Sequence, residues 1–188
     1  MQSFFEKNKM RTFIYIKLPT KILMQIKEIQ EKLPEFMGKK TELKNLHLTL
    51  KFLGEISSDK LKEIKLRLSD VKFNKFEAEI RDLGFFDNRK SDKFDRNIIL
   101  WLGIANCEKI QEEVDRVLDG LYPKENRFMS HLTIARVKKI QDMNNFTENI
   151  KKINIPKMFF TVDKLYLMES ILKKEGSEYK ILEEYFLK

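Results

Sequence analysis

The order of sequence patterns predicts an α+β protein with mainly antiparallel sheets, in which two lobes share one body. Three observations support this prediction. Strand-like and helical patterns follow the order strand, helix, strand, helix, strand, and this order occurs about twice. No Gly-, Ser- or Pro-rich linker separates the two halves. Each half also contains one copy of the tetrad His-Leu-Thr-(Leu/Ile), and such a recurrence indicates an internal repeat.

The first half of the chain has patterns for four strands and two helices. Runs of β-branched and aromatic residues favour strands, and apolar residues every three or four positions favour helices. The strands are expected at 12–18, 46–54, 75–86 and 97–104, and the helices at 20–33 and 57–68. Thr20 is expected to cap the first helix, and Ser57 or Ser58 the second. The buried stripe of the second helix is expected to contain Leu61, Ile64, Leu66 and Leu68.

The second half repeats this order. Helices are expected at 107–121 and 143–153, and strands at 130–139, 158–170 and 178–187. A turn over 173–176 joins the last two strands, and a charged loop over 87–96 joins two strands of the first half. Trp101 is expected in the core. Residues 1–9 precede the first strongly patterned segment, so we expect a loose extension followed by a single bilobal domain over 10–188.

Composition narrows the class of protein. The chain has 188 residues, of which 42% are hydrophobic, and it contains no run of 18 apolar residues, so we expect no membrane span. The first residues have no apolar signal region, and we expect a cytoplasmic monomer. Cys107 is the only cysteine, which excludes an intramolecular disulfide and a cysteine-based zinc cluster. The net charge of +8 favours anionic partners, nucleic acid first among them.

The two tetrads contain the only two histidines of the chain. Alternate side chains of a strand point to opposite faces, so His47 and Thr49 share one face, as do His131 and Thr133. The leucines and isoleucine between and after them would anchor each strand in the core. Two such strands side by side would bring two imidazoles and two hydroxyls together. This set of groups suits a bound anion, because hydroxyls donate hydrogen bonds and an imidazolium adds charge.

Two histidines are also suited to acid–base chemistry near neutral pH. One can take a proton from an attacking water while the other gives a proton to a leaving oxygen. Around an anion this arrangement predicts phosphodiester cleavage or hydrolysis without a covalent intermediate. We expect no metal, because neither tetrad contains the carboxylate or third histidine that would complete a site. Cys107 is rejected as a nucleophile because no histidine remains to activate it.

The paired H-x-T-x motifs resemble those of the 2H phosphoesterase superfamily, in particular its RNA 2′,3′-cyclic phosphodiesterase branch, also called 2′-5′ RNA ligase. The resemblance covers nearly the whole chain from Met10. It includes the segments MRTFIYIKLP, NLHLTLKFLGEI, SHLTIARV and LYLMESILKKEGSEYKIL. Two departures concern substrate contacts: family members often have an aromatic residue where this chain has GKKTELK, and a proline where it has Ser130.

The resemblance implies a bilobal fold with pseudo-twofold symmetry, a cleft between two antiparallel sheets and helices on the outside. It implies that His47 and His131 are the catalytic pair and that Thr49 and Thr133 hold the phosphate. The implied reaction is hydrolysis of RNA 2′,3′-cyclic phosphate ends to 2′-phosphomonoesters, with weak reverse 2′-5′ ligation and no cofactor. We assign His131 as the base and His47 as the acid, and the reverse assignment stays open.

Phe52 and Arg136 each lie five positions after a histidine. Arg136 would clamp phosphate, and Phe52 would stack on a base, as recognition of single-stranded RNA commonly requires. Strict alternation would put both on the face opposite the histidines, so a bulge or the end of the strand must redirect them. The alternative is that Phe52 belongs to the core and Arg136 to the surface.

Two other functions remain open at this point. The first is a related 2H enzyme that acts on small cyclic nucleotides or 2′-5′-linked oligonucleotides. The second is a module that binds RNA or nucleotides without turnover. The intact His and Thr of both tetrads argue against the second, because a protein that only binds has no need for two proton-transfer groups.

Overall fold

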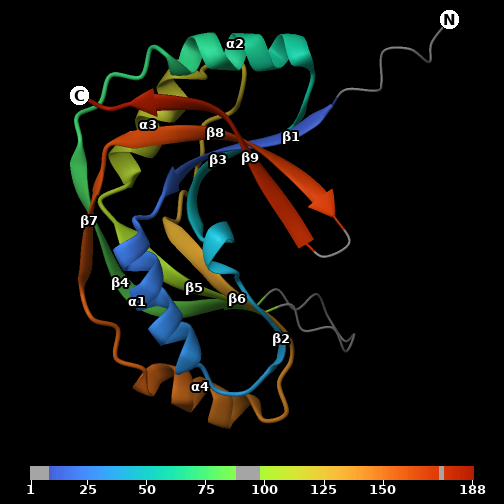
Figure 1. Cartoon of the computed structure of the whole chain (residues 1–188), viewed down its shortest axis with the longest axis vertical. Helices are drawn as coiled ribbons and strands as arrows, with labels where there is room; N and C mark the ends of the chain where they lie inside the picture. The colour runs from blue at the N-terminus through green and yellow to red at the C-terminus, as the bar shows by residue number, and fades with distance from the viewer. Residues whose placement is uncertain (1–8, 88–97, 174–175) are drawn as a thin grey trace, which may run out of the picture.

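The computed structural model describes residues 9–87, 98–173 and 176–188 and contains two antiparallel sheets flanked by helices (Figure 1). Its strands are β1 (Met10–Lys17), β2 (Met37–Lys40), β3 (His47–Ile56), β4 (Phe76–Asp87), β5 (Ile98–Ala105), β6 (His131–Lys139), β7 (Met158–Val162), β8 (Lys164–Lys173) and β9 (Gly176–Phe186). Its helices are α1 (Thr20–Glu31), α2 (Ser58–Leu68), α3 (Glu108–Val117) and α4 (Met143–Lys152), with a short 3₁₀ turn at Leu43–Asn45. The α+β class with two antiparallel sheets is confirmed.

The order of the strands shows the pseudo-twofold relation of the two halves. The first sheet has the order β3-β1-β8-β9, and the second has the order β2-β6-β5-β4-β7. Without β2, each sheet runs outward from a histidine strand, β3 or β6, to the strand that precedes it in the repeat, β1 or β5. The second half of the structure therefore begins with β5, which the sequence analysis had assigned to the first half. The next strand, β8 or β4, comes from the other half. That residues 10–188 form a single domain stays a prediction, and this exchange supports it.

The helices on the outside also cross between the halves. α1 follows β1 of the first sheet but packs against β6 of the second. α3 follows β5 of the second sheet but packs against β3 of the first. The strands β3 and β6 contact each other where the two sheets meet (Figure 1). Each histidine strand is therefore supported from behind by a helix and faces the other half in front.

Three local predictions were wrong, and one strand was missed. The strand expected over 158–170 is interrupted at Asp163, where the chain leaves the second sheet as β7 and enters the first as β8. β2 was not predicted, because its four residues are all exposed and carry no apolar alternation. Thr20 is not the cap of α1, which begins after Pro19 without a side-chain cap. Leu66 lies on the solvent face of α2 and is 70% exposed.

Other local predictions are confirmed. The side chain of Ser57 caps α2 by accepting a hydrogen bond from the backbone N–H of Lys60 at 3.3 Å. The apolar stripes of α1 and α3 are buried at Ile22, Ile26, Ile29, Ile110, Val114 and Val117.

No helix within the described ranges is long and apolar enough to cross a membrane. Apart from Lys9, the expected N-terminal extension lies outside the described residues, as do residues 88–96 of the charged loop and 174–175 of the last turn.

Candidate active site

The two tetrads open the strands β3 and β6 and have the same burial pattern. In both strands the first seven positions are half-buried, buried, half-buried, buried, buried, exposed and buried. His47 and His131 take the first position, and Thr49 and Thr133 take the third. The repeat seen in the sequence is therefore also a repeat in structure, and it places an imidazole and a hydroxyl on the same face of each strand.

A bulge follows each threonine. In β3, Lys51 pairs with Ile14 while Thr49 pairs with Tyr15, so one residue of β3 has no partner position on β1. In β6, the same irregularity lies between the pairs of Thr133 and the residue two positions later. The extra residue of a bulge reverses the alternation of side chains beyond it. Both strands thus satisfy the condition needed to redirect the residue at the sixth position.

Phe52 and Arg136 take that sixth position and are exposed. Phe52 is 69% exposed, so it is not a core residue, and its ring lies 6.1 Å from that of Phe13. Phe13 is also 5.0 Å from the imidazole of His47, measured between ring centroids. The structure therefore brings Phe52 to the same face as His47.

Each imidazole is oriented by an equivalent hydrogen bond to the backbone carbonyl two residues before it. Nδ1 of His47 lies 2.7 Å from the carbonyl oxygen of Asn45, and Nδ1 of His131 lies 2.7 Å from that of Met129. A carbonyl oxygen only accepts hydrogen bonds, so Nδ1 must be the nitrogen that carries the proton. In the neutral ring Nε2 is then the basic nitrogen, and in the charged ring Nε2–H is available as an acid. Both histidines are thus set to exchange protons through Nε2.

The histidines differ in their electrostatic surroundings. Burial lowers the pKa of His47 below its ordinary value, which the hydrogen bond to Asn45 offsets in part. The positive charges of Arg136 and His131 lower the same pKa further. These two residues belong to the other sheet, so their effect on His47 shows that the second tetrad and its arginine lie near the first.

Aromatic side chains surround the histidines, and of these only Tyr179, expected in the final hairpin, was singled out from the sequence as a residue that could contact substrate. The rings of Tyr15 and Tyr179 lie 5.6 and 5.1 Å from His47, and Phe86 lies 5.1 Å from His131 in an edge-on contact. Tyr15 pairs with Thr49 across β1 and β3, and burial raises its pKa to about 12, so its hydroxyl stays neutral near pH 7. The alternation in TFIYIKL could have placed Tyr15 opposite the isoleucines, but sequence alone does not show which strand lies beside it.

Trp101 does not lie in the core, where the sequence analysis expected it. It pairs with Thr133 across β5 and β6, is only half-buried and stacks obliquely with Phe86 at 5.3 Å between ring centroids. A Cβ added to Gly84 would lie 2.3 Å from the indole, so the ring rests against the glycine of the neighbouring strand. Trp101 therefore lies on the face of Thr133 and outside the core.

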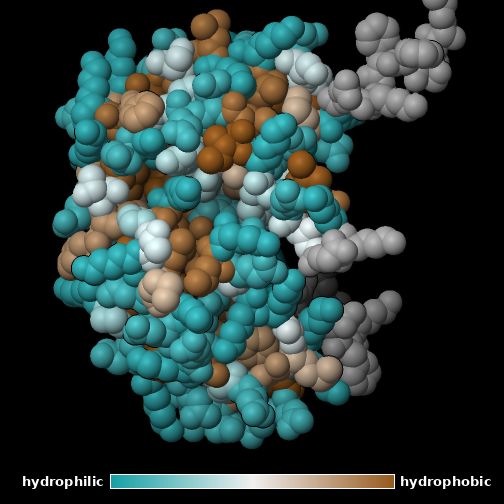
Figure 2. Space-filling model, in the orientation of Figure 1, coloured by the Kyte–Doolittle hydropathy of each residue, from teal (hydrophilic) through white to brown (hydrophobic). Residues whose placement is uncertain are grey.

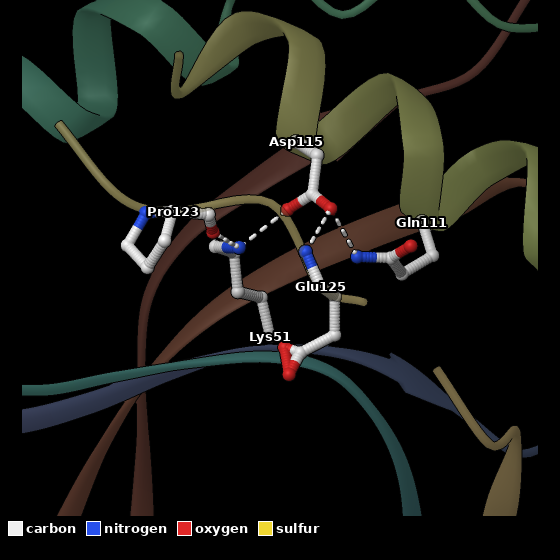
Figure 3. A network of polar contacts seen from close by, with 5 residues as sticks. All are labelled: Lys51, Gln111, Asp115, Pro123 and Glu125. Carbon is white, nitrogen blue, oxygen red and sulfur yellow. Dashed lines mark hydrogen bonds and ion pairs between the residues drawn. The ribbon is translucent and has the colours of Figure 1, made fainter. Parts of the chain in front are cut away.

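A polar network lies behind β3 and was also missed by the sequence analysis (Figure 3). Lys51 and Asp115 form an ion pair in which both side chains are nearly inaccessible, 4% and 6% exposed. Lys51 Nζ also donates to the carbonyl of Pro123 at 2.8 Å, and Asp115 accepts from Gln111 Nε2 and from the backbone N–H of Glu125, both at 2.8 Å. A lone lysine in a strand gives no sequence signal for such a network.

Other groups are less suited to chemistry. Burial raises the pKa of the Cys107 thiol to about 12, which agrees with its rejection as a nucleophile. In the part of the chain that the structure describes, no group of three or more His, Cys, Asp or Glu residues is placed to hold a metal. Figure 2 shows mainly hydrophilic side chains over the visible face, as the excess of charged residues leads one to expect.

The two sheets and their matched tetrads define a class: a two-lobed protein in which the contacting strands β3 and β6 carry two imidazoles, two hydroxyls and an arginine. The same fold occurs in the crystal structure of E. coli LigT complexed with 3′-AMP, with a TM-score of 0.73 and 24% identity. That match covers 96% of this chain and 99% of the other.

Comparison by sequence gives the family. The model of the LigT-like phosphoesterases matches residues 16–93 and 104–179, and the chain belongs to this family. It is 32% identical over 180 residues to the RNA 2′,3′-cyclic phosphodiesterase of Methanocaldococcus jannaschii, covering 94% of this chain and 100% of the relative. It is also 32% identical over 183 residues to the protein of the same name from Thermotoga maritima, covering 93% and 94%.

Proposed function

We propose that this chain hydrolyses 2′,3′-cyclic phosphate ends of RNA to 2′-phosphomonoesters, with weak reverse 2′-5′ ligation. The observation that carries the proposal is the matched orientation of His47 and His131, each bonded through Nδ1 to the carbonyl two residues before it. The names of the relatives from M. jannaschii and T. maritima support this choice of substrate.

In the proposed reaction, water attacks the phosphorus while the bond from phosphorus to the ribose 3′ oxygen breaks. One neutral imidazole takes a proton from the water at Nε2. The other, charged imidazole gives its Nε2 proton to the departing 3′ oxygen. The products are a 3′ hydroxyl and a 2′-phosphate, and the pair has exchanged its protonation states. Solvent restores the starting state.

The environment of His47 favours one assignment of the two roles. Burial and the charges of Arg136 and His131 disfavour the protonated form of His47. His47 is then held in the neutral form that a general base needs, which leaves the acid role to His131. This is the reverse of the first assignment made from the sequence. It stays a proposal, because a bound phosphate favours the charged form of either ring.

The hydroxyls of Thr49 and Thr133 would donate hydrogen bonds to the non-bridging phosphate oxygens, and Arg136 would add a forked, charged donor. Phe52, with 69% of its surface exposed beside Phe13, would stack on the base of the terminal nucleotide. RNA suits this set of groups because phosphate and base are bound on one face by adjacent positions of two strands.

The experiment compares three substrates at equal concentration: an oligonucleotide ending in 2′,3′-cyclic phosphate, free 2′,3′-cyclic mononucleotides and a 2′-5′-linked dinucleotide. We expect the highest kcat/KM for the oligonucleotide and a 2′-phosphate product. Higher kcat/KM for either small substrate would shift the assignment to that related activity. Binding without turnover of any of them would leave a non-catalytic module. Because the motifs offer no third metal ligand, we expect turnover to persist in EDTA.

A further inference from the structure

The ion pair of Lys51 and Asp115 joins β3, the strand of His47, to α3. Lys51 directly follows the extra residue of the β3 bulge, and its side chain points away from the face of His47 toward α3 (Figure 3). The equivalent residue in the second half is Ala135. A buried lysine is costly unless it is paired, so this departure from the repeat calls for a physical reason.

The partners of the pair provide that reason. Lys51 Nζ donates a hydrogen bond to the carbonyl of Pro123, and Asp115 accepts one from the backbone N–H of Glu125, both at 2.8 Å. A third bond, from the hydroxyl of Tyr122 to the carbonyl of Leu53 at 3.2 Å, connects the same segment to the same strand. Tyr122, Pro123 and Glu125 therefore fix this segment to β3 and α3 at three points.

The far end of that segment orients the second histidine. Residues 122–130 run directly into β6, where the carbonyl of Met129 accepts the bond from Nδ1 of His131. The carbonyl of Ser130 accepts from the backbone N–H of Ile104 at 3.0 Å. The chain between the Lys51 network and Met129 is only a few residues long. A displacement at Pro123 would therefore be transmitted to the orienting carbonyl of His131.

The surroundings of Asp115 favour its charged form. Burial raises the pKa of Asp115, but the hydrogen bonds from Glu125, Lys51 and Gln111 outweigh it, and the net result is a pKa below the ordinary value. The carboxylate thus accepts on both oxygens, and the ammonium donates to the carboxylate and to a carbonyl.

We propose that Lys51 and Asp115 are positioning residues for the reaction: they fix the segment 122–130 to the strand of His47 and so set the orientation of His131 relative to His47. This inference rests on the proposed function for its kinetic test alone. Neither residue touches the reacting atoms. Their effect passes through the β3 bulge on one side and through Met129 on the other.

The test separates positioning from stability. Lys51→Met leaves a buried carboxylate without its cation and lowers Tm. In Lys51→Met/Asp115→Leu both charges are gone, and apolar replacement of a buried pair commonly recovers stability. We expect Tm of the double variant to return toward that of the wild type, while kcat stays about 10- to 100-fold low with KM little changed, as a misplaced catalytic group requires. Lys62→Met, which removes the exposed partner of Asp59, is the matched control and should change neither.

A second readout does not depend on turnover. The chain has two histidines, so the NMR signals of their rings can be assigned by their loss in His47→Gln and His131→Gln. We expect the Nδ1–H signal of His131 to shift and to exchange faster with water in the double variant, and to a lesser degree in Tyr122→Phe, a conservative change for use if the double variant does not fold.

The outcomes are distinguishable. If the double variant regains both Tm and kcat, or if the His131 ring signals are unchanged in it, the pair only stabilises the fold and the inference is wrong. If the wild type turns over no cyclic phosphate, the proposed function fails, and the NMR result alone decides the positioning role. Unchanged His131 signals in Tyr122→Phe would likewise contradict it where that variant has to be used.

Discussion

The strands β3 and β6 share a sequence motif and a local structure. Both begin with His-x-Thr, both contain a bulge directly after the threonine, and both orient their histidine through the carbonyl two residues before it. Both are also supported by a helix that follows a strand of the other sheet. These shared features place an imidazole and a hydroxyl on one face of each strand, with Nδ1 of the imidazole bonded to the backbone.

The strands differ at the positions that follow the bulge and in their neighbours. The first has the buried charge of Lys51 and the exposed ring of Phe52, where the second has Ala135 and Arg136. In the second half the support is neutral: Gln30 of α1 donates to the carbonyl of the bulge residue Ile134 at 2.7 Å. In the proposed reaction, the features shared by the two strands would supply the acid–base pair. The features that differ would provide base stacking, phosphate binding and the separate roles of the two histidines.

Removal of either imidazole should cause the largest loss of catalytic activity. We expect His47→Ala and His131→Ala each to lower kcat/KM by about 10²–10⁴, the usual contribution of a positioned acid or base. The double variant should be little worse than the poorer single variant, because groups that act together are strongly non-additive. Steady-state kinetics on a cyclic-phosphate oligonucleotide, with circular dichroism as the folding control, measures this. Near-normal turnover in a folded single variant would make one tetrad structural.

Loss of a hydroxyl should cost less. Thr49→Val and Thr133→Val keep the shape of the side chain and remove one donor to the phosphate, so we expect kcat to fall by about 10- to 100-fold. Thr→Ser at the same positions keeps the donor and serves as the matched control. If valine and serine variants are equally active, the hydroxyls do not contact the phosphate and the two strands are alike only in packing.

Substitutions of Phe52 and Arg136, the residues at the sixth position of β3 and β6, should affect the KM of different substrates. Arg136→Gln removes a charged donor and should raise KM for cyclic mononucleotides and oligonucleotides alike, by roughly tenfold. Phe52→Leu keeps an apolar side chain without a ring, and should raise KM several-fold for substrates with a base, since stacking is worth about 1–3 kcal/mol per base. A substrate lacking a base distinguishes the two: it should be insensitive to Phe52→Leu and sensitive to Arg136→Gln.

Sequence was a good guide to features that recur and a poor one to features that do not. Helical spacing and apolar runs placed most helices and strands. The tetrads predicted that His47 shares a face with Thr49, and His131 with Thr133, as the structure shows. The sequence analysis also predicted that a bulge or the end of the strand redirects Phe52 and Arg136, and the structure has a bulge in both strands. β2 was missed because its stability comes from pairing with β6, which a four-residue polar segment does not reveal.

The remaining errors share one physical cause. Trp101 was expected in the core because apolar runs do not show which face of a strand is covered. Lys51 and Asp115 gave no signal because their partners are distant in sequence: they are separated by 64 positions. The break at Asp163 divides one apolar run between two sheets. In each case tertiary neighbours, and not local propensity, decide the role of the residue.

Salt should separate general attraction from site contacts. If the net charge of +8 guides RNA, the KM of longer oligonucleotides should rise steeply with salt, through counterion release, and the KM of mononucleotides should rise less. The measurement is KM for both substrates over a series of salt concentrations, at constant pH. Equal dependence on salt would mean that the surface charge does not contribute to binding beyond the terminal nucleotide.

The smallest expected effect is a shift of the pH profile, and it tests the asymmetry of the pair directly. Because the pKa of His47 is lowered, a base role for His47 puts the acidic limb of kcat/KM below the ordinary histidine pKa of about 6.5. Activity is then lost only as the pH falls through this lowered value. Arg136→Gln removes one of the charges that lower this pKa, so the limb should move to higher pH. Lys138→Gln removes an equal charge from β6 that does not act on His47, and should leave the limb in place. An acidic limb that does not move in Arg136→Gln would assign the base role to His131, as the sequence first indicated.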